Sequence, residues 1–362
     1  MRRVALTLMM GACTFLLLGG NAWADFQSGG DHLVDYQNPD GGWSWEHGTL
    51  PPVTPSGGSP ANTMGPIGLG LLNAYSHTTD ATHLQAAVDG ANYAIATTYP
   101  NLEARFGTSD PYFFLRLSAV TGDTTYANNA ATEFFDALSA GTYGPSNLNT
   151  AGWISSVQAG RTGLWVNLRP WEFSTIAYTA GQIGNAGQQT DFENAIIAGL
   201  GTLDSAAYYD YLGLAGGLYG LALDGTNIGS TSVGDFGTVA DTTALAALLA
   251  GAQNADGSWN WNSGLGAGNE DTQVTAYATL ALLAADAAGF GNWDSQISQA
   301  RNWLWSMQQP SGGFLSYPGG TENHEVEGEA LQAVPEPMTM MMLGCIGAGM
   351  AAARKLRRKN KA

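Results

Sequence analysis

The chain has 362 residues, of which 30 are acidic and 13 are basic, and its formal charge at pH 7 is −17. Between residues 25 and 333 it contains no lysine and no cysteine, so this region forms no disulfide and has no thiol chemistry. Its acidity excludes a protein that binds the phosphates of nucleic acid or an anionic lipid surface. The region is long enough for one large domain with its own core.

The first 24 residues have the pattern of a secretory signal. Arg2 and Arg3 precede an apolar run over residues 4–18, and the small-x-small sequence Ala22-Trp23-Ala24 follows. This pattern predicts cleavage by signal peptidase after Ala24. The alternative is an uncleaved anchor, although the apolar run is short for a membrane span. We therefore expect residues 1–24 to be a signal peptide and residues 25–333 to be an exported domain.

A similar turn sequence occurs three times along the exported domain. It reads DYQNPDGGWSW at residues 35–45, GAQNADGSWNW at residues 251–261 and, in a weaker form, SMQQPSGGFLSY at residues 306–317. Each copy has a glutamine, a polar turn, one or two glycines and then aromatic residues. Turn residues of this kind end a helix and reverse the chain.

Two types of helix alternate between these turns. Residues 270–284 begin with an acidic cap and are apolar on nearly every side, which predicts a helix buried on both faces. Residues 293–308 have apolar groups mainly on one face, which predicts a half-exposed helix. Buried inner helices are expected to begin near Asn62, Asp110, Glu172, Tyr208, Asp271 and Glu327, and outer helices near Asp31, Thr82, Thr124, Thr190, Asp235 and Trp293.

The irregular spacing of these helices indicates a closed ring of about six helical hairpins, not a tandem solenoid. Loops of unequal length would then meet at one mouth of the ring. Glycines inside the expected helices are interpreted as positions of close helix packing, despite their cost to helix stability. An all-β fold built on the glycine- and tryptophan-rich turns is the alternative.

The repeated turn resembles the QW motif of squalene–hopene and oxidosqualene cyclases, and EDTQVTAYATLALLA (residues 270–284) resembles an inner helix of their α/α toroid. The resemblance implies an all-α (α/α) toroid over roughly residues 31–333. It also implies a structural role for the turn residues, which are Gln37 with Trp43, Gln253 with Trp259, and Gln308 with Phe314. The third pair departs from the motif because it has phenylalanine in place of tryptophan.

The activities of that fold class are not supported by the sequence. The Asp-x-Asp-Asp motif of the cyclases is absent, and the domain lacks the cysteine of the prenyltransferase zinc site. We therefore do not expect terpene cyclase or prenyltransferase activity. Fold alone does not specify function.

Four loop segments, at residues 45–48, 160–173, 260–271 and 317–329, are expected to converge at the ring mouth. Aromatic faces beside polar side chains suit a glycan, because rings stack on pyranose faces while polar groups bind hydroxyls. The expected ligand-binding residues are Trp45, Trp165, Trp171, Trp261, Tyr317 and Arg161. The candidate catalytic residues are Glu172, Asp271, Glu327, Arg169, His47 and His324.

These candidates fit more than one role. A glycosidase needs two carboxylates about 5–9.5 Å apart, which Glu172, Asp271 and Glu327 would supply. A polysaccharide lyase would instead use an arginine or a His/Tyr pair. Capping of helix N-termini explains the same three carboxylates without catalysis.

The five histidines are scattered along the sequence, with no HExxH or other metal-ligand spacing, and His32, His77 and His83 are expected at the surface. The sequence therefore predicts no metal and no cofactor. Ca²⁺ at the turns of Asp40 and Asp256 is the alternative to a purely structural role for those residues.

The C-terminal segment, residues 334–362, has three parts. Val334, Pro335, Glu336 and Pro337 form a VPEP motif, followed by an apolar stretch over residues 338–353 and a basic tail. This arrangement resembles the PEP-CTERM sorting signal, which implies recognition and cleavage by an exosortase-type peptidase and a Gram-negative source that makes exopolysaccharide. The apolar stretch would reach about 24 Å as a helix, short of the roughly 30 Å hydrocarbon core.

The basic tail should stay cytoplasmic, so that the bulk of the chain lies on the periplasmic or extracellular side with a transient inner-membrane anchor. A plain single-span anchor is the alternative. Together these features predict a secreted or cell-envelope protein whose toroid binds or processes a glycan, such as an exopolysaccharide. A non-catalytic matrix protein, or a polysaccharide lyase or glycoside hydrolase, are the alternatives.

Overall fold

The computed structural model describes residues 25–48, 50–97 and 108–334. The expected signal peptide, and the sorting segment beyond Val334 with its transmembrane helix, lie outside the described residues. Within the described ranges, no helix is long and apolar enough to cross a membrane.

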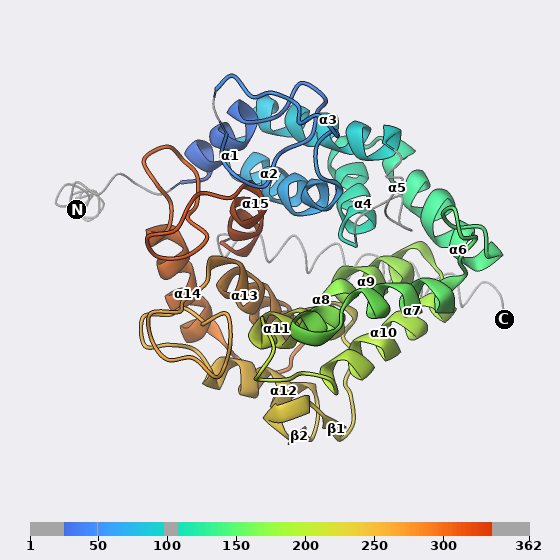
Figure 1. The fold of residues 1–362 in the computed structure, drawn as a ribbon, viewed down its shortest axis with the longest axis vertical. Helices are drawn as coiled ribbons and strands as arrows, with labels where there is room; N and C mark the ends of the chain where they lie inside the picture. Colours follow the sequence, from blue (N-terminus) through green and yellow to red (C-terminus); the bar gives the residue numbers. More distant parts are fainter. Residues whose placement is uncertain (1–24, 49, 98–107, 335–362) are drawn as a thin grey trace, which may run out of the picture.

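The helices form two concentric rings (Figure 1). The inner helices are α2 (Met64–Thr78), α4 (Asp110–Thr121), α9 (Ser174–Ile183), α11 (Asp210–Asp224), α13 (Thr272–Ala287) and α15 (His324–Ala333). Each packs against the next, and α15 closes the ring by packing against α2. They are apolar on nearly every side because they lie between the outer helices and the centre of the ring.

The outer helices alternate with the inner ones along the chain. They are α1 (Phe26–Asp35), α3 (Ala81–Ala96), α5 (Thr125–Asn129) continued by a π-helical segment (Ala130–Asp136) and α6 (Ala137–Ala140), α10 (Ala186–Leu200), α12 (Thr242–Gly251) and α14 (Asp294–Ser306). The predicted helical ring with alternating inner and outer helices is therefore observed, and the all-β alternative is wrong.

Shorter elements fill the connections. They are α7 (Thr150–Gly160), α8 (Arg169–Glu172), 3₁₀ turns at Ala61–Thr63, Gly163–Leu168 and Gly234–Phe236, and the strands β1 (Thr231–Ser232) and β2 (Thr238–Val239). The strands are antiparallel, with Thr231 opposite Val239.

Four predicted helix starts differ from the structure by three residues or more. The outer helices expected near Asp31 and Thr190 begin at Phe26 and Ala186. The outer helix expected near Asp235 begins at Thr242, because Gly234 and Gly237 adopt positive φ angles in the turn between β1 and β2. The last inner helix begins at His324 instead of Glu327. The Asn323 side chain caps it by accepting hydrogen bonds from the backbone N–H groups of residues 325 and 326.

Ring closure depends on close backbone contact between α2 and α15. A Cβ added at Gly70 would lie 2.5 Å from the carbonyl oxygen of Gly328, and one at Gly328 would lie 2.7 Å from the carbonyl oxygen of Pro66. Any larger residue would push these two helices apart. The packing gain therefore offsets the cost of glycine within a helix.

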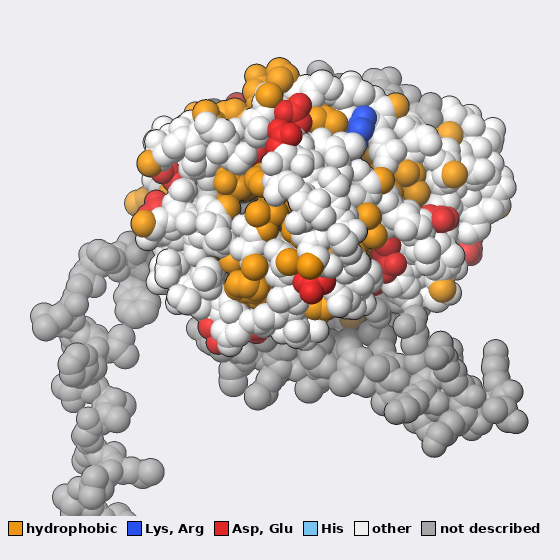
Figure 2. All heavy atoms as spheres, turned by 90° about the horizontal axis from the view of Figure 1, so that it is seen from below, with side chains coloured by type: hydrophobic (Ala, Val, Ile, Leu, Met, Phe, Trp, Pro, Cys, Tyr) orange, Lys and Arg blue, Asp and Glu red, His pale blue; other side chains and the backbone are white. Residues whose placement is uncertain are grey.

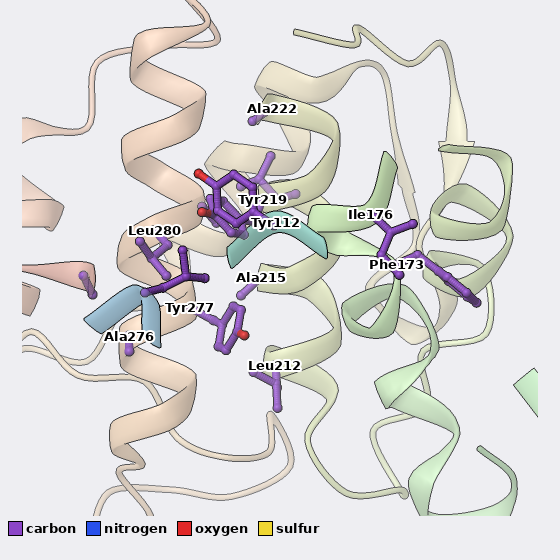
Figure 3. Packing of buried hydrophobic residues seen from close by; sticks show 14 of the residues in the cluster. Tyr112, Phe173, Ile176, Leu212, Ala215, Tyr219, Ala222, Ala276, Tyr277 and Leu280 are labelled. Carbon is purple, nitrogen blue, oxygen red and sulfur yellow. The ribbon is translucent and has the colours of Figure 1, made fainter. Parts of the chain in front are cut away.

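Tyrosines occupy the space between the inner helices (Figure 3). Tyr219 of α11 and Tyr277 of α13 lie between α11 and α13, and Tyr112 of α4 comes close to Tyr219. Phe173 and Ile176 pack on the other side of α11. The rings of Tyr219 and Tyr277 meet edge-on with centroids 6.4 Å apart. Burial raises the pKa of both hydroxyls well above 10, so they remain neutral hydrogen-bonding groups.

The three repeated turns have one geometry. The glutamine Nε2 donates to the carbonyl of a glycine four residues later, at 2.8 Å for Gln37, 2.9 Å for Gln253 and 3.0 Å for Gln308. Each Nε2 also donates to a backbone carbonyl on or beside the next outer helix, at Ala86, Gln296 and Asp25 respectively. The turns thus link α1 to α3, α12 to α14, and α14 to the start of α1.

The first aromatic residue after the glycines of each turn, which is Trp43, Trp259 or Phe314, is fully buried. The indole N–H of Trp43 donates to the carbonyl of Leu33 at 2.7 Å, and that of Trp259 donates to the carbonyl of Leu249 at 2.9 Å. Phe314 is equally buried but has no N–H to donate. Each tryptophan therefore joins the turn back to the helix that precedes it.

The outer wall on the side of α12 and the two strands is shown in Figure 2. Acidic side chains are spread over this face among hydrophobic ones, and little basic surface is in view. This surface is consistent with the acidic composition of the sequence.

Candidate functional site

A cavity of about 790 Å³ opens where the N-terminal ends of the inner helices meet. Trp45 comes from the loop after the first repeated turn, and Arg161, Trp165 and Trp171 come from the segment before α9. Gln273 at the start of α13 and Glu325 at the start of α15 add polar groups to the lining, which also includes Ser44, Glu46, Asn62 and Asn323. Three of the four loop segments expected at the mouth thus contribute directly to one cavity.

Exposed aromatic rings form part of the cavity wall. Trp45 and Trp165 are 48% and 46% exposed. Trp165 stacks on Tyr209, with ring centroids 6.1 Å apart, and meets Tyr208 edge-on. Trp261 packs behind this wall against both tyrosines. The wall presents flat apolar faces to any molecule that enters the cavity.

Arg161 and Glu172 form an ion pair beside the cavity, in which Glu172 is buried and Arg161 is partly exposed. The Arg161 Nε donates to Glu172 Oε1 at 2.6 Å, and its Nη2 contacts the same oxygen. Glu172 is only 5% exposed. The Arg169 Nε donates to the backbone carbonyl of Arg161 at 3.0 Å, so Arg169 holds the segment that positions the ion pair. Charge-assisted contacts of this kind are shorter and stronger than hydrogen bonds between neutral groups.

Glu325 lies next to this ion pair. The pKa of Glu325 is raised to about 7, mainly by burial and also by the negative charge of Glu172, although a hydrogen bond with Trp45 opposes this rise. Two neighbouring carboxylates therefore have different environments, because Glu172 has a cation in contact and Glu325 has another carboxylate.

Two more carboxylates extend this acidic group toward α13. Gln273 Nε2 donates to Glu329 Oε1 at 3.1 Å, and burial raises the pKa of Glu329 well above its ordinary value, with Glu325 adding to the effect. Asp271 caps α13 by accepting from the backbone N–H of Val274 at 2.9 Å. Burial nevertheless raises the pKa of Asp271 to about 6.

Three histidines converge behind the wall that carries Trp45 and Glu325. They are His32 of α1, His47 of the first loop and His324 at the start of α15. His32 Nδ1 lies 2.8 Å from Glu327 Oε2, and Tyr36 OH lies 2.7 Å from His47 Nε2. Burial lowers the pKa of His324 to about 4, and burial raises the pKa of Glu327 to about 7 although His32 opposes that rise.

The expectation of scattered, surface histidines is therefore wrong for several of them. His32 and His83 are 3% and 0% exposed. His83 Nε2 contacts Asp31 Oδ1 at 3.0 Å, and His77, which is half-buried, stacks on Phe26 at 3.9 Å. The histidine positions follow from the ring closure, which sequence spacing does not reveal.

The structure separates the predicted site residues into groups. Trp45, Trp165, Trp171 and Arg161 line the cavity, with Glu172 and Arg169 supporting it. His47, His324 and Glu327 belong to the neighbouring histidine group, and Asp271 caps a helix. Trp261 and Tyr317 lie outside the cavity lining, with Tyr317 exposed on its loop.

The turn aspartates have local roles. Asp40 Oδ1 accepts from the backbone N–H of Gly42 at 3.0 Å, and Asp256 Oδ1 accepts from that of Ser258 at 3.1 Å. These bonds shape the turns in the way expected of aspartate in such positions.

Glu325 and Glu329 lie in the segment at residues 317–329 that was expected at the mouth, but neither was among the candidate catalytic residues. Gln273 and Tyr209 were not predicted to be site residues. Glu325 and Glu329 belong to the segment HEVEGE, in which glutamates recur at every second residue within an otherwise apolar inner helix. Glutamates in the first turns of a helix are common as dipole partners, so their number alone did not indicate a site. Their burial is a property of the assembled ring.

Comparisons with known proteins show the fold. No family model and no curated protein matches the chain. An unsaturated glucuronyl hydrolase specific for heparin is similar in structure, with a TM-score of 0.52 and 13% identity over 85% of this chain and 94% of the other. A possible member of the GH105 family from Klebsiella pneumoniae subsp. pneumoniae has a TM-score of 0.52 and 12% identity over 86% and 91%.

A type II terpene cyclase from Scytonema, in complex with its substrate geranylgeranyl dihydroxybenzoate, has a TM-score of 0.50 and 12% identity over 88% of this chain and 96% of the other. The chain has the α/α-toroid fold. Proteins of this fold carry out unrelated reactions, so the activity must be argued from the cavity and its residues.

Proposed function

We propose that the protein is a glycan-processing enzyme of the glycoside hydrolase type, and that its reaction takes place in the cavity at the ring mouth. One observation carries this proposal. Two neighbouring carboxylates, Glu172 fixed by Arg161 and Glu325 without a cation in contact among the described residues, lie beside exposed tryptophans at one cavity.

The chemistry requires one ionised and one protonated carboxyl group. The Arg161 guanidinium contacts Glu172 Oε1 and fixes its position, and we assign Glu172 as the base or nucleophile that acts on the sugar or on water. Glu325, which faces the negative charge of Glu172, carries the proton that passes to the glycosidic oxygen. The faces of Trp45 and Trp165 would hold the pyranose rings.

A lyase reaction is less well supported by the same cavity. β-Elimination needs a base near the sugar carbon, and Tyr209 is the tyrosine that lines the cavity. Burial raises the pKa of Tyr209 to about 12, and nearby carboxylates add to that rise. A tyrosine held neutral in this way is a poor base.

The charge of the cavity favours a substrate with few negative charges. Glu46 and Glu325 line it, and Glu172, Glu329 and Asp271 lie close by, whereas Arg161 is engaged with Glu172. A polyanion would be repelled. The similar glucuronyl hydrolase is specific for heparin, but we propose a neutral or weakly charged glycan for this chain.

We also propose that the protein is exported and handed to the cell envelope by its terminal segments. The support for this is the sequence pattern of residues 1–24 and 334–362. Fractionation of cells that make the full chain, with signal-segment and VPEP variants, is the test. Recovery of the unprocessed chain in the cytoplasm would contradict the proposal.

The enzymatic proposal is tested by a panel of neutral and acidic polysaccharides, with separate assays for new reducing ends and for unsaturated products. We expect the full chain to release reducing ends from at least one neutral glycan without unsaturated products. Glu325→Gln should remove this activity, and Glu133→Gln, at an exposed position on the outer ring, should retain it. Unsaturated products, or the absence of cleavage and binding across the panel, would contradict the proposal.

A further inference from the structure

We propose that His32, His47, His324 and Glu322 bind a divalent transition-metal ion of the Zn²⁺ type, which fastens the two ends of the helical ring together. One nitrogen from each histidine lies within 4.8 Å of the others. Glu322 Oε2 lies 3.2 Å from His32 Nε2 and 2.8 Å from His47 Nδ1. Imidazole nitrogens with one carboxylate oxygen form a donor set that suits Zn²⁺ and its neighbours among the first-row metals.

The second nitrogen of each imidazole already has a partner. His324 Nδ1 lies 2.8 Å from the backbone carbonyl oxygen of Ser44, which only accepts, so Nδ1 carries the hydrogen and Nε2 presents a lone pair. His32 Nδ1 lies 2.8 Å from Glu327 Oε2, and the same reasoning leaves its Nε2 free to coordinate. Metal-binding histidines are oriented in this way by a carbonyl or a carboxylate behind them.

His47 completes the same pattern with the opposite nitrogen. Its Nε2 lies 2.7 Å from Tyr36 OH, and its Nδ1 points to Glu322. The three rings therefore turn His32 Nε2, His324 Nε2 and His47 Nδ1 toward one place beside Glu322.

The atoms that face one another there are not hydrogen bonded. His324 Nε2, His32 Nε2 and Glu322 Oε2 are buried and make no contact with hydrogen-bond geometry, although Glu322 Oε2 lies within ion-pair distance of His32 and His47. His324 and His32 are 1% and 3% exposed. Buried polar atoms without a partner are rare because each costs free energy. With metal–ligand distances of about 2.0–2.1 Å, neighbouring ligand atoms lie about 2.9–3.4 Å apart. The contacts of Glu322 Oε2 are 3.2 Å, within this range, and 2.8 Å, just below it.

The charge balance points to a cation as well. Glu327 is fully buried and Glu322 is 15% exposed, and both make their ion pairs with histidine among the described residues. The region between residues 25 and 333 has no lysine to pair with them. Buried carboxylates without a cation are unfavourable, and a divalent ion at this place offsets both charges.

A second group of possible ligands, Asp31, Asp80 and His83, lacks these features. Its atoms are used in hydrogen bonds: Asp80 accepts from Thr82 and Gln27, and His83 contacts Asp31 and Thr78. We therefore do not propose that this second group binds a metal ion.

The position of the proposed metal site gives it a structural task. His32 and His47 come from the first hairpin, whereas Glu322 and His324 come from the start of the last inner helix. The link from His32 to Glu327 spans 295 positions of the chain. Because the ligands meet only in the folded ring, metal binding stabilises the fold and holds the Trp45 loop against α15.

The experiment uses the full chain, stripped with a chelator and dialysed against Zn²⁺, with bound metal measured by elemental analysis. We expect one Zn²⁺ per chain and a rise in Tm of about 4 °C when free Zn²⁺ is 100 times its Kd. His47→Gln and Glu322→Gln, at the two more exposed ligands, should weaken binding by more than about 100-fold, because loss of a supporting residue alone costs about 10–100-fold. His77→Gln is the matched control and should bind normally.

Circular dichroism of each variant without metal shows whether it folds. Loss of binding in folded His47→Gln and Glu322→Gln, with normal binding by His77→Gln, would support the site. Absence of stoichiometric binding by the unmodified chain, or equal affinity in the two ligand variants and the control, would overturn it. These readouts do not depend on glycan cleavage, so the metal site and the proposed activity fail or succeed separately.

Discussion

The glutamine of the repeated turn provides a quantitative test of how the outer ring is held together. Gln253 Nε2 donates to the carbonyl of Gly257 at 2.9 Å within its own turn and to the carbonyl of Gln296 on α14 at 2.8 Å. In Gln253→Met the side chain keeps nearly the same length but donates to neither carbonyl. At about 0.5–1.5 kcal/mol for each net hydrogen bond, the free energy of unfolding should fall by about 1–3 kcal/mol.

The assay is equilibrium urea unfolding followed by circular dichroism, with Gln299→Met as the matched control. Gln299 is exposed on α14 and makes one long contact, 3.3 Å, with Ser295 Oγ. Its replacement should change the free energy of unfolding by less than about 0.5 kcal/mol. If the two variants have the same stability, the turn glutamine does not link α12 to α14 in the manner described.

Three further outcomes follow from the structure. Gly257→Ala should destabilise the protein more than Gly289→Ala. Both glycines have positive φ (99° and 81°), but only at Gly257 would an added Cβ meet a backbone oxygen, at 2.4 Å. Urea unfolding compares the two variants, and equal losses of unfolding free energy would contradict the close approach. Trp45→Ala should weaken glycan binding about tenfold, measured by calorimetry. Tyr317→Ala should leave the affinity unchanged, because Tyr317 lies outside the cavity lining. Equal effects of the two substitutions would place the glycan elsewhere. Burial raises the pKa of Asp271 to about 6 from its ordinary 3.8, so the contribution of its protonated form to stability is lost as pH rises from about 4 through 6. Asp271→Asn should lack this loss. If the unfolding free energies of the variant and the unmodified chain change equally between pH 4 and 7, the shift is contradicted.

Much of the fold could be predicted from the sequence because its signals are local. The inner helix after Asp271 is apolar on every side, and its acidic cap is adjacent in the sequence. The repeated turns were also legible, since the glutamine and its glycine acceptor are four residues apart. The prediction near Asp235 was wrong because two glycines with positive φ, Gly234 and Gly237, form a turn where helix periodicity was expected.

The candidate site could be predicted only in part. Trp45 and Arg161 were identified because aromatic and cationic residues in long loops stand out from an acidic chain. The pairing of Glu172 with Arg161 is local, but its proximity to Glu325 arises from ring closure between distant hairpins. The histidine group was missed for the same reason: residues 32, 47 and 324 have no common spacing, and only the packing of α15 against α1 and α2 brings them together.

The proposed activity is tested most directly by measuring kcat/KM of the Glu325→Gln variant on two substrates that contain the same sugar. One is the glycan that the unmodified chain cleaves, and the other is an aryl glycoside whose leaving group departs without a proton. Loss of a general acid should lower kcat/KM on the glycan by about 10²–10⁴-fold and leave the aryl glycoside nearly unaffected. Glu172→Gln should be slow on both. Equal losses on the two substrates in Glu325→Gln, or unchanged rates, would contradict the assignment of Glu325 as the proton donor in the ring mouth.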